Sequence, residues 1–145
     1  MSLSEKISQL DNSNMFEIIK SFPKQIITAL NIIENNYTLK SNSGVSKVMI
    51  LGMGGSAIGG VLLRSYLNVI PGANHLNIQV SRNYDIPNHI DSNTLVIASS
   101  YSGDTEETLN AVAQASEKTK HIICVTTGGA LSKFAVKNQF PIVKL

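Results

Sequence analysis

Charged residues are scarce in this 145-residue chain, and the basic ones are not clustered. Asp, Glu, Lys and Arg make up 15% of the sequence, against about 25% in typical soluble domains, and the formal net charge is +2. A protein that binds the nucleic-acid backbone needs a stripe of Lys and Arg to meet the phosphates. The composition therefore argues against nucleic acid as a partner.

Cysteine is almost absent, since Cys124 is the single one. No disulfide within the chain and no cysteine-based metal site can form, and its apolar surroundings, HIICV, predict a small buried side chain in a reducing compartment. The histidines His75, His89 and His121 lack the spacing of metal ligands. We expect neither a metal nor another cofactor.

Long apolar segments are also missing. The apolar run between Lys47 and Arg64 is shorter than the ~18–20 residues of a membrane span, and glycines interrupt it. The N-terminal stretch carries Glu5, Lys6 and Asp11 where a secretion signal would have an apolar core. These absences predict a cytoplasmic protein with no membrane partner.

Five short runs rich in β-branched and aliphatic residues predict strands: KVMIL, NIQV, TLVIA, HIICV and PIVKL. Helical stretches separate most of them, at 56–67, 105–118 and about 130–138, whereas the polar residues 81–93 predict a loop. Alternating strands and helices are typical of a parallel sheet, and continuously apolar strands imply helices on both faces. The sequence thus predicts a three-layer, doubly wound α/β domain with a mainly parallel, five-stranded sheet.

An N-terminal helical extension precedes the sheet. Residues 14–36 predict two helices, with Pro23 in the favoured first position of the second. The second helix has an apolar face of 3.6-residue period, made of Ile26, Ile27, Leu30 and Ile33. We expect this leader, residues 1–44, to pack on a domain formed by residues 45–145.

Two strands end in loops rich in glycine and hydroxyl groups, GMGGSA and SSYSGDT. If the strand order is 2-1-3-4-5, both loops lie where the winding reverses, which is where doubly wound sheets bind ligands. A tight turn explains the glycines of the first loop equally well. The functional interpretation is a site for a phosphate monoester, formed by Gly54, Gly55, Ser56, Ser100, Ser102, Gly103 and Thr105.

Several polar residues near these loops have a simpler explanation. Asp104 and Glu107 have the spacing of a capping box, which would make the second loop a plain helix start. Glu106 and Glu107 suit the first turn of a helix, and a catalytic base at Glu106 is the lesser alternative. Thr127 and Gly128 fit either a pocket wall or a helix start. We assign no catalytic residue.

The motifs GMGGSAIGG, SSYSGDTEETL and VTTGGAL, with NYDIP and the leader DNSNMFEIIKSFPKQIITAL, resemble the sugar isomerase (SIS) domain. Within it they resemble the bifunctional phosphoglucose/phosphomannose isomerases. The resemblance implies a flavodoxin-like fold and an enzyme that interconverts glucose 6-phosphate or mannose 6-phosphate with fructose 6-phosphate. It also implies a homodimer whose phosphate ligands are Gly55, Ser56, Ser100, Ser102 and Thr105.

The chain departs from that family's pattern in three residues and in length. Ala57 and Asp104 stand where many members have Gly and Asn, and Val61 replaces a frequent acidic residue. Members carry two such domains, with the catalytic His, Glu and Lys in the second. The resemblance therefore implies the first half of an isomerase, a chain that binds the phosphate but is not a complete enzyme.

Two other functions remain open. Gly52, Gly54 and Ala57 satisfy the glycine pattern of a dinucleotide-binding fold, and Ser81 with Arg82 would suit the 2′-phosphate of NADP. The second alternative is a non-catalytic sensor, because a single SIS domain can recognise a sugar phosphate within a regulator. The NADP alternative leaves the hydroxyls of SSYSGDT unexplained.

Overall fold

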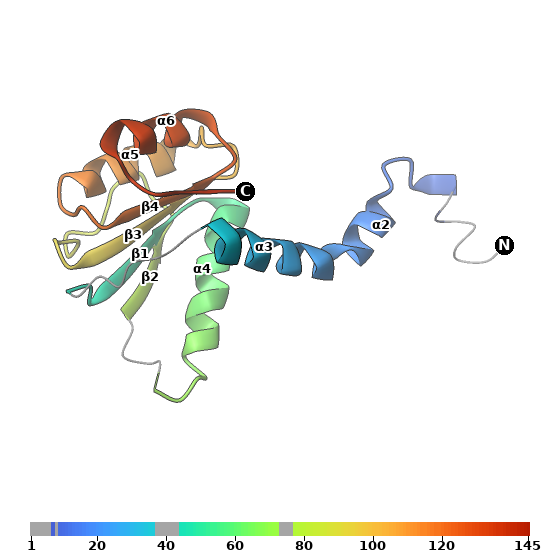
Figure 1. Ribbon diagram of the computed structural model, residues 1–145, viewed down its shortest axis with the longest axis horizontal. Helices are drawn as coiled ribbons and strands as arrows, with labels where there is room; N and C mark the ends of the chain where they lie inside the picture. Colours follow the sequence, from blue (N-terminus) through green and yellow to red (C-terminus); the bar gives the residue numbers. More distant parts are fainter. Residues whose placement is uncertain (1–6, 8, 37–43, 73–76) are drawn as a thin grey trace. The chain divides into compact units, whose positions relative to one another are not determined.

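The computed structural model describes residues 7, 9–36, 44–72 and 77–145. The chain divides into two compact units, residues 1–39 and 40–145, which are described separately (Figure 1). No helix in the described ranges combines the length and the apolar character needed to cross a membrane. The prediction that the leader packs on the domain stays a prediction.

The larger unit is built on a five-stranded parallel sheet. Its strands are β1 (Lys47–Leu51), β2 (Asn77–Ser81), β3 (Thr94–Ser99), β4 (Ile122–Thr126) and β5 (Ile142–Lys144). Their order in the sheet is β2-β1-β3-β4-β5, so the winding reverses between β1 and β3. The predicted strands are confirmed, and the order is the one under which the two polar loops were expected to meet.

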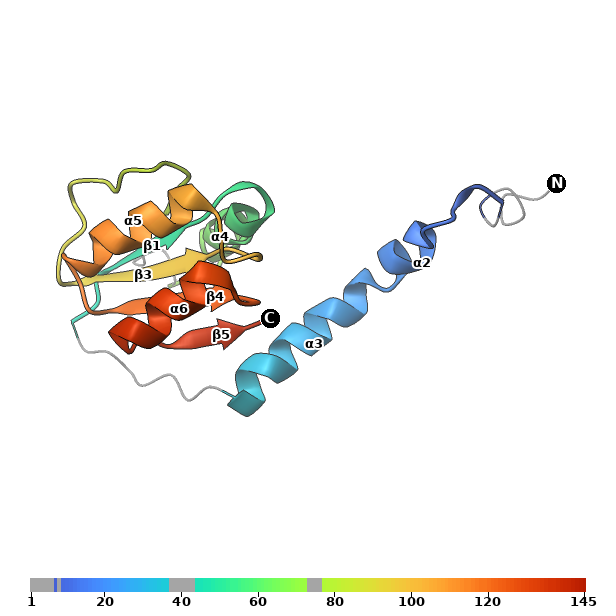
Figure 2. The same cartoon turned by 90° about the horizontal axis from the view of Figure 1, so that it is seen from above.

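Three helices cover this sheet: α4 (Gly54–Leu67), α5 (Glu106–Ser116) and α6 (Gly129–Asn138). Figures 1 and 2 show α5 and α6 on one face and α4 on the other. The predicted three-layer α/β architecture is therefore correct. Helix α4 begins two residues before the predicted start, because Gly54 and Gly55 belong to its first turn instead of a separate turn.

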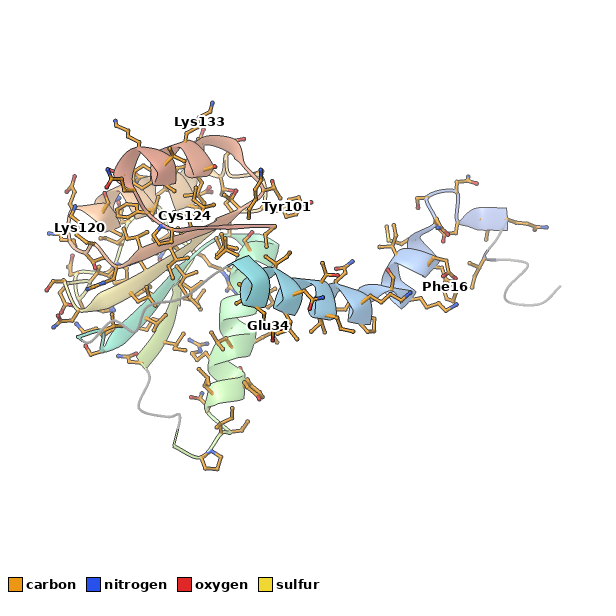
Figure 3. All side chains as sticks on the ribbon, in the orientation of Figure 1. Phe16, Glu34, Tyr101, Lys120, Cys124 and Lys133 are labelled. Atoms are coloured by element: carbon orange, nitrogen blue, oxygen red, sulfur yellow. The ribbon has the colours of Figure 1, made fainter. Side chains whose placement is uncertain are left out.

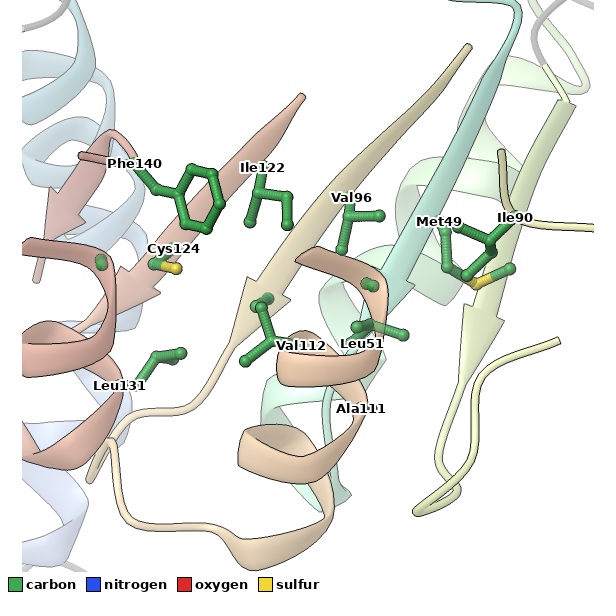
Figure 4. Close-up of a cluster of buried hydrophobic side chains, with 13 residues drawn as sticks. Met49, Leu51, Ile90, Val96, Ala111, Val112, Ile122, Cys124, Leu131 and Phe140 are labelled. Carbon is green, nitrogen blue, oxygen red and sulfur yellow. The ribbon is translucent and has the colours of Figure 1, made fainter. Parts of the chain in front are cut away.

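The main hydrophobic core lies between the sheet and the α5/α6 layer (Figure 4). Its central members include Met49, Leu51, Val96, Ala111, Val112, Ile122, Cys124 and Leu131. Burial raises the pKa of the Cys124 thiol to about 11, so this side chain remains a neutral apolar group at physiological pH. The prediction of a buried cysteine is confirmed.

The opposite face of the sheet is covered less completely. Helix α4 contacts β2 and β1, and Gly60 allows the close approach, since a Cβ there would lie 2.7 Å from Ile50 Cδ1. Over β3 and β4 the same face is half-buried at Leu95, Ile97, Ile123 and Val125. The outer side of α4 also exposes apolar residues, namely Ile58, Leu62 and Tyr66.

The smaller unit contains α2 (Met15–Lys20) and α3 (Phe22–Asn36), which confirms the two predicted leader helices. Pro23 is the second residue of α3, so it still stands in the first turn. The Asp11 carboxylate accepts hydrogen bonds from the backbone of Met15 and Phe16, which lowers its pKa and secures the start of α2. The predicted apolar face of α3 is exposed in the structure.

Candidate anion-binding site

The loops after β1 and β3 meet at the carboxyl end of the sheet, as the winding order predicts. Leu51 pairs with Ala98, so the two strands end side by side. A Cβ at Gly52 would lie 2.9 Å from the carbonyl oxygen of Ser99, which explains why glycine begins the first loop. The backbone N–H of Tyr101 donates to Ser56 Oγ at 3.4 Å and connects the loops directly.

The hydroxyls of the second loop accept hydrogen bonds from its own backbone. Ser100 is buried, its Oγ accepts from the Gly103 N–H at 3.1 Å, and it lies 2.9 Å from Thr105 Oγ1. Ser102 Oγ accepts from the Asp104 N–H at 3.2 Å. A hydroxyl that accepts a hydrogen bond still has its own proton to donate. The same holds for Ser56, so the geometry offers hydroxyl donors to an anion.

Gly103 is the position at which the second loop touches the loop after β4. Its φ of +77° favours glycine, and a Cβ there would overlap the carbonyl oxygen of Gly128. The Gly103 carbonyl in turn accepts from the Leu131 N–H at 2.8 Å. Two backbones therefore pack against each other with no side chain between them.

The capping-box prediction for Asp104 is wrong. The N-cap of α5 is Thr105, which makes no side-chain capping bond. Asp104 Oδ1 instead accepts from the Ala130 N–H at 2.8 Å, so its carboxylate caps α6, a helix 26 residues away in sequence. The assignment of Glu106 and Glu107 to the first turn of α5 is confirmed.

The three helix starts around the site differ in how they are capped. The N-cap side chains of α4 and α5, Met53 and Thr105, make no capping hydrogen bond, whereas Asp104 holds the start of α6. Space above the start of α4 is open, because a Cβ at Gly54 or Gly55 would meet nothing within 4 Å. An anion would therefore find room and backbone donors at α4 and α5.

Thr127 and Gly128 support the second loop from the β4 side. Thr127 donates twice to the Tyr101 carbonyl, from Oγ1 at 2.7 Å and from its backbone N–H at 3.1 Å. Sequence reasoning missed the role of Thr126, whose buried Oγ1 donates to the Gly128 carbonyl at 3.0 Å. The VTTGG motif carries that signal, because threonines before a glycine pair often satisfy turn backbone.

The loop after β2 is anchored on α5. Asn110 Nδ2 and Gln114 Nε2 donate to the Tyr84 carbonyl at 2.9 and 3.1 Å. The charge of Glu107 is the main cause that raises the pKa of Tyr84, so its phenol stays protonated. Tyr101 extends from the second loop toward solvent (Figure 3).

The two histidines in the described ranges lie outside the two polar loops. His89 lies in the loop after β2 and His121 just before β4, whereas His75 lies outside the described residues. Within the described ranges, no group of three or more His, Cys, Asp or Glu side chains could hold a metal ion.

Comparisons with known proteins agree with this fold. Residues 43–139 match the family model described as "SIS domain". The chain is 44% identical over 131 residues to a bifunctional phosphoglucose/phosphomannose isomerase of Caldicellulosiruptor bescii, a match covering 90% of this chain and 38% of that protein. It is 33% identical over 134 residues to a D-glucosamine-6-phosphate 4-epimerase of Sulfolobus acidocaldarius, covering 92% and 39%.

A solved structure has the same fold. The hypothetical protein TT0462 from Thermus thermophilus superposes with a TM-score of 0.64 at 21% identity, covering 97% of this chain and 40% of that one. The chain thus spans about two fifths of the length of the proteins it resembles.

Proposed function

The chain belongs to the SIS domain family, and on that premise we propose that residues 54–56 and 100–105 bind the phosphate group of a sugar phosphate. The observation that carries the proposal is the meeting of two hydroxyl-bearing loops, joined by the hydrogen bond from Tyr101 N–H to Ser56 Oγ. Both loops lead into helices whose N-cap side chains make no capping bond. Such helix starts favour an anion through their amides and their dipole.

The two loops supply different sets of donors in this proposal. Gly54 and Gly55 let the phosphate approach the backbone of α4, and Ser56 adds a hydroxyl. In the second loop the hydroxyls of Ser102 and Thr105 would donate to the phosphate. Ser100 Oγ is hydrogen-bonded to Thr105 Oγ1 and accepts from the Gly103 N–H, which fixes the loop. Neither loop contains Lys or Arg, so neutral donors would hold the anion. This arrangement suits reversible binding of a small ligand.

We propose that the reaction of the whole protein is the interconversion of glucose 6-phosphate or mannose 6-phosphate with fructose 6-phosphate. The support is the 44% identity to a phosphoglucose/phosphomannose isomerase. The epimerase relative is named for a hexosamine 6-phosphate, which supports the same class of ligand for a different reaction. A non-catalytic sensor remains the alternative for this chain.

We further propose that this chain alone binds without isomerising. Isomerisation needs a base that moves a proton between adjacent carbons and a group that opens the sugar ring. Of the acids closest to the loops, Asp104 is hydrogen-bonded to α6, while Glu106 and Glu107 stand in the first turn of α5. A coupled assay tests this: turnover of glucose 6-phosphate that disappears in Glu106→Gln would identify a base that we leave unassigned.

The binding test is a calorimetric titration of fructose 6-phosphate into the wild type and Ser102→Ala. A hydrogen bond to a charged group contributes ~1.5–3 kcal/mol, so the variant should bind about 10- to 100-fold more weakly. Ser116→Ala, at the far end of α5, is the matched control and should bind as the wild type does. Equal affinity of fructose 6-phosphate for the wild type and Ser102→Ala would contradict the proposed site. Micromolar binding of NADP would favour the dinucleotide alternative.

We also propose a cytoplasmic homodimer. The support is the apolar outer side of α4, where Leu62 and Tyr66 are exposed on the side away from the sheet. Exposed apolar patches of this kind commonly mark protein interfaces. Light scattering of the purified chain measures its oligomeric state, and a monomer at micromolar concentration would contradict the proposal.

A further inference from the structure

Two buried hydroxyls outside the proposed phosphate site have no hydrogen-bond partner. They are Ser81 Oγ, at the end of β2, and Thr108 Oγ1, in the first turn of α5. The two residues are 7% and 2% exposed. Buried polar groups are nearly always hydrogen-bonded, because losing water without gaining a partner destabilises the fold. Two such groups close to a ligand site call for an explanation.

Both residues line one narrow crevice at the carboxyl edge of the sheet. Its empty space is about 130 Å³, including the part that is open to solvent at the mouth. The remaining lining comes from the end of β1, the residues after β2 and the start of α5: Leu51, Gly52, Met53, Arg82, Asn83, Glu107 and Ala111. Leu51 and Ala111 also belong to the main hydrophobic core, where Figure 4 labels both.

The crevice adjoins the phosphate site through both of its loops. Gly52 and Met53 directly precede Gly54, and Thr108 follows Thr105 by less than one helical turn. A ligand whose phosphate lies at the starts of α4 and α5 can therefore reach the crevice with its other groups. The inference rests on the proposed function for this reason.

The free protein has no means of satisfying these hydroxyls inside the crevice. The space between its walls is too narrow to hold a water molecule. Its rim, however, consists of long side chains, with Arg82 exposed and Glu107 half-exposed. For a ligand hydroxyl to reach Ser81 and Thr108, the side chains of this rim would have to rotate outward.

The chemistry of the lining selects the kind of group that fits. Ser81 and Thr108 each donate and accept, Arg82 only donates, and the Glu107 carboxylate only accepts. A ligand hydroxyl donates one hydrogen bond and accepts up to two, so it can pair with groups of either kind, whereas a second phosphate would be repelled by Glu107. We propose that this crevice binds a hydroxyl-bearing carbon of the sugar, while the phosphate binds at the two loops.

The proposal predicts that removing either hydroxyl raises the stability of the protein and lowers its affinity for the sugar phosphate. Ser81→Ala and Thr108→Val each remove one unpaired hydroxyl with almost no change in shape. Each variant should unfold at a higher temperature than the wild type, because a buried group without a partner has been removed. Each should bind fructose 6-phosphate about 2- to 10-fold more weakly, because a neutral hydrogen bond to the sugar is lost.

The experiment compares two ligands on the same proteins. Calorimetry measures the affinity of inorganic phosphate and of fructose 6-phosphate for the wild type, Ser81→Ala, Thr108→Val and Ser102→Ala. We expect Ser102→Ala to weaken the binding of both ligands. We expect the two crevice variants to weaken the binding of fructose 6-phosphate alone. Two separate crevice variants are used so that a folding defect in one leaves the other to decide.

Each outcome separates this inference from the proposed function. If phosphate binds the wild type and Ser102→Ala weakens it, the phosphate site stands. If the crevice variants then leave the affinity for both ligands unchanged, or lower both affinities equally, the sugar subsite alone is overturned. If neither ligand binds the wild type, the proposed function and the subsite fail together.

Discussion

The loops after β1 and β3 end neighbouring strands, yet they are held very differently. The first loop is open, since a Cβ at Gly54 or Gly55 would touch nothing, and Ser56 connects it to its neighbour by one long hydrogen bond. The second loop is fixed by hydrogen bonds that the side chains of Ser100 and Asp104 accept and by the backbone contact at Gly103. The comparison shows one loop that is fixed by its neighbours and another that leaves open space beside it. Fixed donors cost little reorganisation when an anion arrives.

The largest effect on the fixed second loop is expected from Gly103→Ala. Its Cβ would overlap the Gly128 carbonyl and would also force a left-handed alanine, so we expect a loss of about 3 kcal/mol or more in the free energy of unfolding. Gly54→Ala is the matched control, because its φ of +49° is also positive but its surroundings are empty. Urea unfolding should show a loss of about 1 kcal/mol in the free energy of unfolding for the control. Equal losses in the two variants would refute the close packing at Gly103.

A second test removes the connection between the second loop and α6. Asp104→Ala loses the bond to the Ala130 N–H, and loss of a helix cap destabilises by about 0.5–2 kcal/mol. Asp104→Asn keeps an oxygen acceptor and should retain most of the stability, which separates the hydrogen bond from the charge. Thermal unfolding compares the three proteins. An Asn variant as unstable as the Ala variant would show that the carboxylate charge, not the bond, holds α6.

The smallest effect is expected in the open loop, at Gly55→Ala. Gly55 lies inside α4 at a φ that any residue adopts, so alanine should raise the free energy of unfolding by roughly 0.5–1 kcal/mol. The new methyl group would occupy the space left for the anion, so phosphate affinity should fall. Calorimetry and urea unfolding on the same variant provide both values. Unchanged affinity would place the phosphate away from the start of α4.

The fold could be predicted because its signals are local. The run KVMIL coincides with β1, and alternation of apolar runs with helical stretches was enough to predict the parallel sheet, although its strand order entered only as an assumption. Both loops were found because glycine and hydroxyl residues follow apolar strands at Gly52 and Ser99. Each of these patterns spans only a few residues, so one sequence contains all the information needed.

The details of the site depend on contacts between distant residues, and these were not predictable. Asp104 has a suitable Glu107 three residues later, yet its carboxylate meets Ala130 because the loops after β3 and β4 touch. The sequence pattern singled out Ser81 only for the NADP alternative, and it gave no signal at Thr108. Only the three-dimensional arrangement shows that both are buried without a partner.

If the proposed function holds, the contact between Gly103 and Gly128 also restricts the route by which a ligand could enter and leave. Because the two backbones touch directly, the second loop cannot swing outward without carrying the start of α6 with it. Exchange of the proposed ligand would then proceed past Gly54 and Gly55, where a Cβ would meet nothing within 4 Å. In the proposed function, the first loop would therefore limit both the binding and the release of the anion, and the fixed second loop would contribute to its affinity by holding donors in place.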